Sequence, residues 1–242
     1  MKTIFTKTLS IACAAFLLSA TPVLAQTAEP FDFKGVKLGI SIDEFRKLPH
    51  PDADDKDAHY AAKESAAVCT GEKVSISANY TIEPTEVMLY DRAEQAAGVV
   101  KCVWVNKSND RMAKGKTAAL SLADSGYAVY DYSFSFIPDP KDGVLRFYRF
   151  VGETNRNTFG AVVSALAHKF GKPIVTQDEV QNGLGNRFTR TMAIWRNNTS
   201  EIFVTDRSSE VNKMVIIVSH KGLLQVYEKA ISAKKPLSKN PI

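Results

Sequence analysis

Two neighbouring aromatic segments constrain the fold of this 242-residue chain more than any other feature. Residues 127–136 (YAVYDYSFSF) and 144–152 (VLRFYRFVG) carry large apolar side chains at alternating positions. A period of two is typical of β-strands with one buried face. The linking sequence IPDPKDG is rich in Pro, Asp and Gly, which favour a loop. We therefore predict an antiparallel hairpin whose rings pack mostly in a core.

Helices are predicted on either side of this hairpin. Ser41 and Glu44 have the spacing of a capping box and begin a short helix that ends before Pro49. Residues 158–170 place apolar side chains at helical spacing and are followed by Gly and Pro. A third, amphipathic helix covers residues 223–231. Strands are predicted at 73–80, 87–90 and 99–105, and four more between Ile174 and His220.

The order of elements is a helix followed by strands, given twice. Runs of strands, rather than strict alternation of strand and helix, predict an α+β fold of two helix-plus-antiparallel-sheet units, with the helices packed on one sheet face. The first α+β unit is assigned to residues 26–152 and the second to residues 153–233. Residues 234–242 are expected to be a disordered basic tail.

The N-terminus has the pattern of an export signal. Lys2 and Lys7 precede an apolar run, Leu9 to Ala20, which is too short to remain as a membrane anchor. An N-terminal membrane helix is the alternative, but Pro22 ends the run early. We predict a signal peptide over residues 1–25, with cleavage between Ala25 and Gln26, and a periplasmic protein without a transmembrane segment.

Two cysteines remain after the signal, Cys69 and Cys102. An exported chain meets an oxidising compartment, so a disulfide between them is expected. A catalytic thiol with a spare cysteine is the alternative, and it would require a reduced, activated thiolate.

The net charge of +5 does not predict binding to nucleic acid. The signal contributes +2 and the lysines of residues 229–242 contribute +4, so the body of the chain is close to neutral at −1. Binding to nucleic acid relies on a concentrated basic surface. A local basic stretch, residues 101–116, leaves polyanion binding by this stretch and the tail as a minor hypothesis.

No residue set predicts a catalytic, cofactor or metal site. The segment HPDADDKDAH (50–59) lacks the Gly and the final acid of a calcium loop, and its two His lack a third zinc ligand. His168 is expected on a helix surface and His220 at a strand end. Phosphate loops, dinucleotide fingerprints and the HExxH motif are missing from the sequence. We therefore predict no cofactor, and a non-catalytic protein is favoured over an enzyme.

Several segments together resemble a known group of proteins. They are FKGVKLGISIDEF (33–45), the paired cysteines, the aromatic hairpin, FGAVVSALAHKFGKP (159–173) and WRNN (195–198). In this order they resemble uncharacterised exported proteins of Gram-negative bacteria, a resemblance that implies a periplasmic location. The arrangement is more loosely similar to the helix-plus-sheet repeats of β-lactamase inhibitor protein and of small outer-membrane assembly lipoproteins. This is a likeness of architecture, which does not fix function.

These observations predict a non-catalytic binding or interaction module of the cell envelope. An envelope protein or a glycan is the expected partner, and aromatic rings beside Arg146 and Arg149 could offer the binding strip. The alternative is an envelope hydrolase acting on peptidoglycan or polysaccharide, which would need acids and histidines that converge in one cleft.

The export signal generates a direct prediction. The chain expressed in a Gram-negative host should be recovered from the periplasm with Gln26 as its first residue, which intact-mass measurement and N-terminal sequencing check. Replacing Ala25 by Phe should block processing, because the peptidase requires a small residue there. A periplasmic chain that keeps Met1 would contradict the prediction.

Overall fold

The computed structural model describes residues 29–54, 62–77, 80–82, 91–107, 114–122, 127–208 and 210–234. The predicted signal peptide with its Ala25–Gln26 cleavage site, the strand predicted at 87–90, and nearly all of the 234–242 tail lie outside these residues. The helical elements are α1 (Ile42–Phe45), η1 (Ala62–Glu64), α2 (Arg92–Ala96), η4 (Arg156–Thr158), α3 (Phe159–Phe170) and α4 (Lys221–Lys234).

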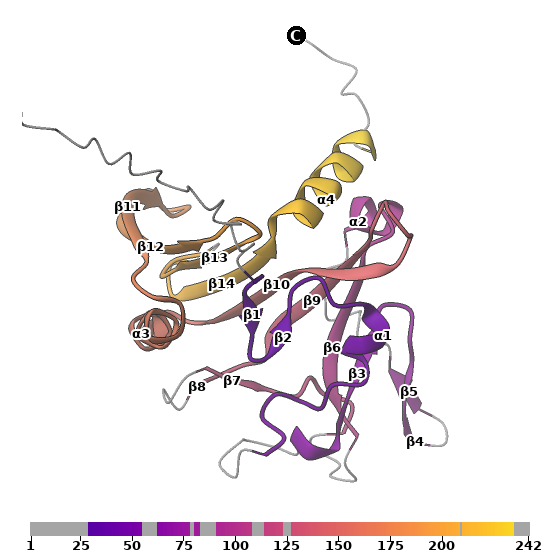
Figure 1. Cartoon of the computed structure of the whole chain (residues 1–242). Coiled ribbons are helices and arrows are strands. Elements are labelled where there is room, and N and C mark those ends of the chain that lie inside the picture. Colours follow the sequence, from indigo (N-terminus) through magenta and orange to yellow (C-terminus); the bar gives the residue numbers. More distant parts are fainter. Residues whose placement is uncertain are drawn as a thin grey trace, which may run out of the picture.

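An antiparallel sheet of eight strands forms the centre of the molecule (Figure 1). Its strands, in spatial order, are β11 (Ile174–Gln181), β12 (Arg187–Arg196), β13 (Ser200–Thr205), β14 (Lys213–His220), β10 (Leu145–Asn155), β9 (Asp131–Pro138), β6 (Val100–Asn106) and β3 (Ser65–Cys69). Small two-stranded sheets accompany it: β1 (Asp32–Phe33) with β2 (Val36–Lys37), β4 (Val74–Ser77) with β5 (Tyr80–Ile82), and β7 (Leu120–Leu122) with β8 (Tyr127–Val129).

Each half of the chain contributes a four-stranded meander to this one sheet. The meanders are β3–β6–β9–β10 and β11–β12–β13–β14, and their last strands lie side by side. β10 and β14 pair in an antiparallel register from Arg149 opposite Ser219 to Asn155 opposite Lys213. Since β10 runs from Leu145 to Asn155, it also passes the boundary expected between residues 152 and 153.

The predicted α+β class, with helices on one sheet face, is wrong. The chain is mostly β, about 45% strand and 23% helix, and is closer to a β-sandwich. Short strands that have no clear periodicity in the sequence, among them β1, β2 and β7, bury Phe33, Val36 and Leu120 against the main sheet. The helices also lie on both faces: α1 and α3 pack on the larger core, and α4 packs on a smaller one.

The alternation of the aromatic hairpin explains these two faces. Phe134, Phe136 and Phe147 point into the larger core, whereas Ile137 and Tyr148 point into the smaller core under α4. Phe134 lies at the centre of the larger core, with ring centroids 4.9–5.4 Å from those of four other aromatic side chains: Phe45, Trp104, Phe147 and Phe150. The predicted hairpin is confirmed over Asp131–Pro138 and Leu145–Asn155, whereas residues 127–129 form the separate strand β8 and Tyr130 is exposed.

The expected aromatic strip beside Arg146 and Arg149 is covered. A register shift between Phe147 and Arg149 marks a β-bulge, and it lets the neighbouring side chains Tyr148 and Arg149 both face α4. There the Tyr148 ring stacks on that of Tyr227, with centroids 5.2 Å apart, and Arg149 lies over the Tyr227 ring. Tyr148 is fully buried, so it offers nothing to a glycan.

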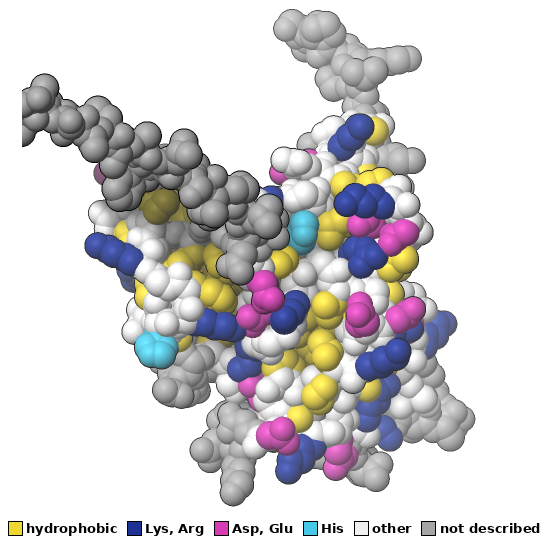
Figure 2. All heavy atoms as spheres, viewed as in Figure 1, with side chains coloured by type: hydrophobic (Ala, Val, Ile, Leu, Met, Phe, Trp, Pro, Cys, Tyr) yellow, Lys and Arg dark blue, Asp and Glu magenta, His cyan; other side chains and the backbone are white. Residues whose placement is uncertain are grey.

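Basic and acidic side chains lie intermingled over much of the face in Figure 2. Ion pairs of the described residues include the exposed pairs Arg196–Glu201 and Arg187–Glu179 and the more buried pairs Lys34–Asp52 and Lys101–Glu94. Lys101, which begins the basic stretch 101–116, is almost buried and is therefore unavailable to a polyanion. Among the described helices, none is long and apolar enough to cross a membrane.

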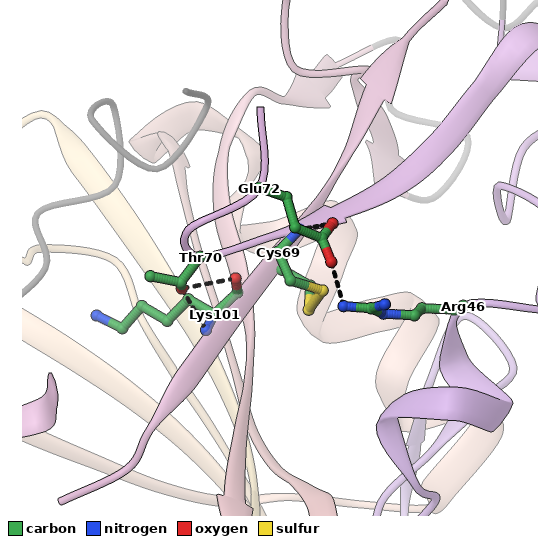
Figure 3. Close-up of a disulfide and its surroundings, with 6 residues drawn as sticks. Arg46, Cys69, Thr70, Glu72 and Lys101 are labelled. Carbon is green, nitrogen blue, oxygen red and sulfur yellow. Dashed lines mark hydrogen bonds and ion pairs between the residues drawn. A yellow bond between two sulfur atoms is a disulfide. The ribbon is translucent and has the colours of Figure 1, made fainter. Parts of the chain in front are cut away.

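The predicted disulfide is confirmed and joins β3 to β6. Cys69 and Cys102 lie opposite each other in the register, with Cα atoms 4.0 Å apart. Beyond them, the Thr70 N–H donates to the Lys101 carbonyl. The Thr70 hydroxyl also donates to this carbonyl and accepts from the Lys101 N–H (Figure 3). Glu72 accepts a hydrogen bond from the Cys69 N–H and forms an ion pair with Arg46. The disulfide therefore links two strands that already pair with each other in the sheet.

Removing the disulfide should destabilise the fold without altering its architecture. The sequence separation of 33 residues corresponds to about 3.7 kcal/mol in the chain-entropy model, and a loss of about 2–4 kcal/mol is expected for the Cys69→Ala/Cys102→Ala variant. Urea unfolding of this variant, and of the wild type with and without reductant, measures the loss. Equal midpoints for the oxidised and reduced wild type would contradict it.

Candidate functional site

A pocket of about 470 Å³ lies where three distant segments of the chain meet. Gly39 comes from the strand-like segment after β2, the acidic loop 139–142 and Arg146 come from the β9–β10 hairpin, and His220 with the first turns of α4 comes from the end of the chain. We call it the His220 pocket. Its lining residues are Gly39, Asp139, Pro140, Lys141, Asp142, Arg146, His220, Gly222, Leu223 and Val226.

Arg146 is fixed by acceptors on three sides. Its Nη2 lies 2.6 Å from Asp142 Oδ2, its Nε lies 3.3 Å from Asp139 Oδ2, and its Nη1 donates to the Gly39 carbonyl at 3.3 Å. The hydrogen bond from Arg146 holds the pKa of the Asp142 carboxyl below its usual value, and that of Arg146 is raised by the same bond. Charge-assisted bonds of this kind give the pocket a defined wall.

The acidic residues also shape the hairpin loop. The Lys141 N–H donates to Asp139 Oδ1 and the Val144 N–H donates to Asp142 Oδ1. Gly143 has a φ of +74°, a conformation that favours Gly, and its N–H donates to the Asp139 carbonyl at 2.7 Å. The loop that the sequence predicts from its Pro, Asp and Gly residues thus presents both carboxylates towards Arg146.

His220 caps α4 and closes the other side of the pocket. Its Nδ1 accepts a hydrogen bond from the Leu223 N–H at 3.3 Å, so the neutral ring carries its proton on Nε2. The ring lies between two glycines, and a Cβ at Gly39 or Gly222 would stand 3.7 or 3.5 Å from it. Burial lowers the pKa of His220, which keeps the ring neutral at pH 7.

Hydrogen bonds fix the donor and acceptor groups that the pocket presents. With Nδ1 occupied by a backbone N–H, His220 presents an Nε2–H donor and lacks the free lone pair of a general base. Asp142, with its lowered pKa, is ionised and does not suit the role of a general acid.

In the described part of the histidine-containing acidic segment, residues 50–54, His50 and Asp52 are buried. His50 is buried with its ring edge towards Trp104, at a centroid distance of 5.4 Å, and its Nδ1 accepts a bond from the Asp52 N–H. Asp52 forms an ion pair with Lys34 at 2.5 Å and accepts a bond from the Ser121 N–H. His59 lies outside the described residues. Within the residues that are described, no three His, Cys, Asp or Glu side chains gather to hold a metal.

The remaining singled-out residues have structural roles. Ser41 forms the predicted capping box with Glu44, and His168 is exposed on α3. Glu94 is buried and bonded by Lys101, by Arg149 and by the hydroxyl of Tyr227. This ion cluster ties α2 and α4 to the sheet.

No protein-family model, curated protein or solved structure matches the chain.

The sequence predicts His220 at a strand end and the acidic loop in a hairpin, but no local pattern places the two together. One local signal was present: Asp142 and Arg146 are four residues apart across a turn. The decisive arrangement places Gly39 beside both Arg146 and His220, in segments more than 70 residues apart, and it depends on the pairing of β10 with β14.

His220 should make the fold sensitive to mild acid. Because its pKa is lowered from 6.5 in the folded state, the unfolded chain binds the proton more tightly, so stability is lost as the pH falls through 6.5. His220→Asn keeps a capping acceptor but does not titrate, and should show a smaller loss between about pH 7 and pH 5.

Urea unfolding at several pH values measures this effect, and the Cε1–H signal of His220 in NMR gives its pKa. His168→Asn, on the exposed face of α3, is the matched control. Identical pH profiles for His220→Asn and the wild type would contradict the assignment.

Proposed function

We propose that this chain is an exported, non-catalytic binding protein of the bacterial cell envelope, and that the His220 pocket receives a polar, uncharged part of its ligand. The export-signal pattern and the Cys69–Cys102 disulfide support a periplasmic location, because disulfides persist in oxidising compartments. The resemblance to exported proteins of Gram-negative bacteria supports the same location.

The proposal rests on the ion pairs and hydrogen bonds that hold the pocket's ionisable groups in place. Arg146 is neutralised by Asp139 and Asp142, and the Nδ1 of His220 is held by α4. Groups that are fixed in this way form a preorganised surface, which lowers the entropy cost of binding. Asp142, whose pKa is lowered by its bond to Arg146, does not serve as the protonated acid that glycoside hydrolysis requires.

The chemistry of the pocket fits a glycan. The Nε2–H of His220 can donate to a hydroxyl, and the carboxylates of Asp139 and Asp142 can accept from hydroxyls. Leu223, Val226 and Pro140 provide apolar contact for the carbon–hydrogen face of a sugar ring. Since the acids are balanced by Arg146 and Lys141, the pocket favours a neutral group over a strongly charged one.

Titration with soluble disaccharide-peptide fragments of peptidoglycan tests the proposal. Calorimetry should detect binding, and the His220 ring signal in NMR should shift. Val226→Phe, which fills the pocket, should weaken binding by about tenfold or more, corresponding to roughly 1.4 kcal/mol. His168→Asn is the control that should bind as the wild type does.

Mass spectrometry of the fragments after long incubation separates the two functions. Recovery of uncleaved fragments would support the assignment as a binding protein. Cleaved fragments would instead establish an envelope hydrolase, and fragments that neither bind nor shift the His220 signal would refute the glycan as ligand.

A further inference from the structure

β11 is a long edge strand of the sheet, and its outer side is open to pairing with another strand. It ends the strand order, pairs with β12 alone, and is exposed along most of its length (Figure 1). Its pairing with β12 is regular from Ile174 opposite Ile194 to Gln181 opposite Arg187, without a bulge. Ile174 and Val175 are exposed at 57% and 56%. Proteins usually blunt such an edge with Lys, Pro or a bulge, and β11 contains none of these.

The strand at the other edge of the sheet, β3, is protected against such pairing. β3 is only five residues long. The N–H of Cys69 points away from β6 and is covered by the carboxylate of Glu72, which Arg46 holds in place (Figure 3). In the described part of the chain, no group plays this role for β11.

The hydrogen bonds of β12 identify the main-chain groups that β11 leaves open. Thr191 accepts from the Asp206 N–H through its carbonyl and donates its own N–H to Asp206 Oδ1, so both groups point away from β11. Gln177, opposite Thr191, therefore belongs to a pair without mutual hydrogen bonds. Its N–H and C=O point to the open edge, and alternation places those of Val175 and Glu179 there too.

This open edge is complementary to itself. In an antiparallel pairing centred on Gln177, Ile174 lies opposite Val180 of the second copy, Val175 opposite Glu179, and Thr176 opposite Asp178. Ile174 meets Val180 on one face, Val175 meets Glu179 on the other face, and no acid faces another acid. Shifting the centre to Asp178 would place two Asp178 carboxylates opposite each other, which is unfavourable.

The acidic side chains of β11 are already neutralised within each copy. Asp178 is bonded by Arg190, and Glu179 lies 3.4 Å from Arg187. Two copies can therefore approach without the repulsion that charged edges normally provide.

We propose that β11 pairs edge to edge with β11 of a second copy, centred on Gln177, so that the two eight-stranded sheets become continuous. The outward N–H and C=O groups of Val175, Gln177 and Glu179 supply the intermolecular hydrogen bonds. The proposed dimer interface contains no residue of the His220 pocket, which lies at the β9–β10 loop and the start of α4.

Gln177→Pro tests the pairing directly. Proline removes an outward N–H and leaves the bonds to β12 intact, which an edge strand tolerates. Sedimentation velocity should show a concentration-dependent dimer for the wild type and a dimer dissociation constant raised at least about tenfold for Gln177→Pro. Gln177→Ala loses the same side chain but keeps the N–H, and should dimerise as the wild type does.

A charge pair tests the register, and does so even if Gln177→Pro fails to fold. Ile174→Lys should weaken the dimer, and the double variant Ile174→Lys/Val180→Glu should restore it, because each Lys then faces a Glu of the other copy.

A wild type that stays monomeric at every concentration overturns the proposal. So does a dimer that Gln177→Pro leaves unchanged while folded, or a double variant no better than Ile174→Lys. A monomer in which the outward amides of Val175, Gln177 and Glu179 resist hydrogen exchange would mean that another segment covers the edge, and would also overturn it.

Discussion

The structure depends on the pairing of β10 with β14. These strands end the two meanders, and their antiparallel register from Arg149–Ser219 to Asn155–Lys213 joins both halves into one sheet. The same register brings the beginning of β10 and the end of β14 to one end of the sheet. Arg146 and His220 consequently line one pocket, although they lie far apart in the sequence.

A buried carboxylate fixes the second layer on this sheet. Glu94 is desolvated, which is costly for a charge unless partners compensate it. Lys101, Arg149 and the Tyr227 hydroxyl do so from two strands and from α4. The bulge at Tyr148 is needed for this arrangement, because it turns Arg149 to the same face as Tyr148. Since Leu223 and Val226 are also on α4, this ion cluster sets the position of the pocket's apolar wall.

Local features were predictable from the sequence and long-range ones were not. The aromatic hairpin, the helix at 158–170, the Ser41–Glu44 capping box and the cysteine pair all have signals within a few residues or a single chemical rule. The fold class was wrong because strands such as β1 and β7 are too short to show a period, and because periodicity does not say which sheet face a helix covers. The pocket was missed because no local pattern links Gly39, Arg146 and His220.

The place of α4 at the end of the described chain has a consequence for how the protein matures. α4 begins at Lys221, provides the N–H that orients His220, and covers Tyr148 and Glu94. During synthesis it is the last of these elements to emerge, after the whole sheet has been made. The molecule can therefore acquire most of its fold before it acquires a pocket, and an incomplete chain would expose the smaller core while having nothing with which to bind.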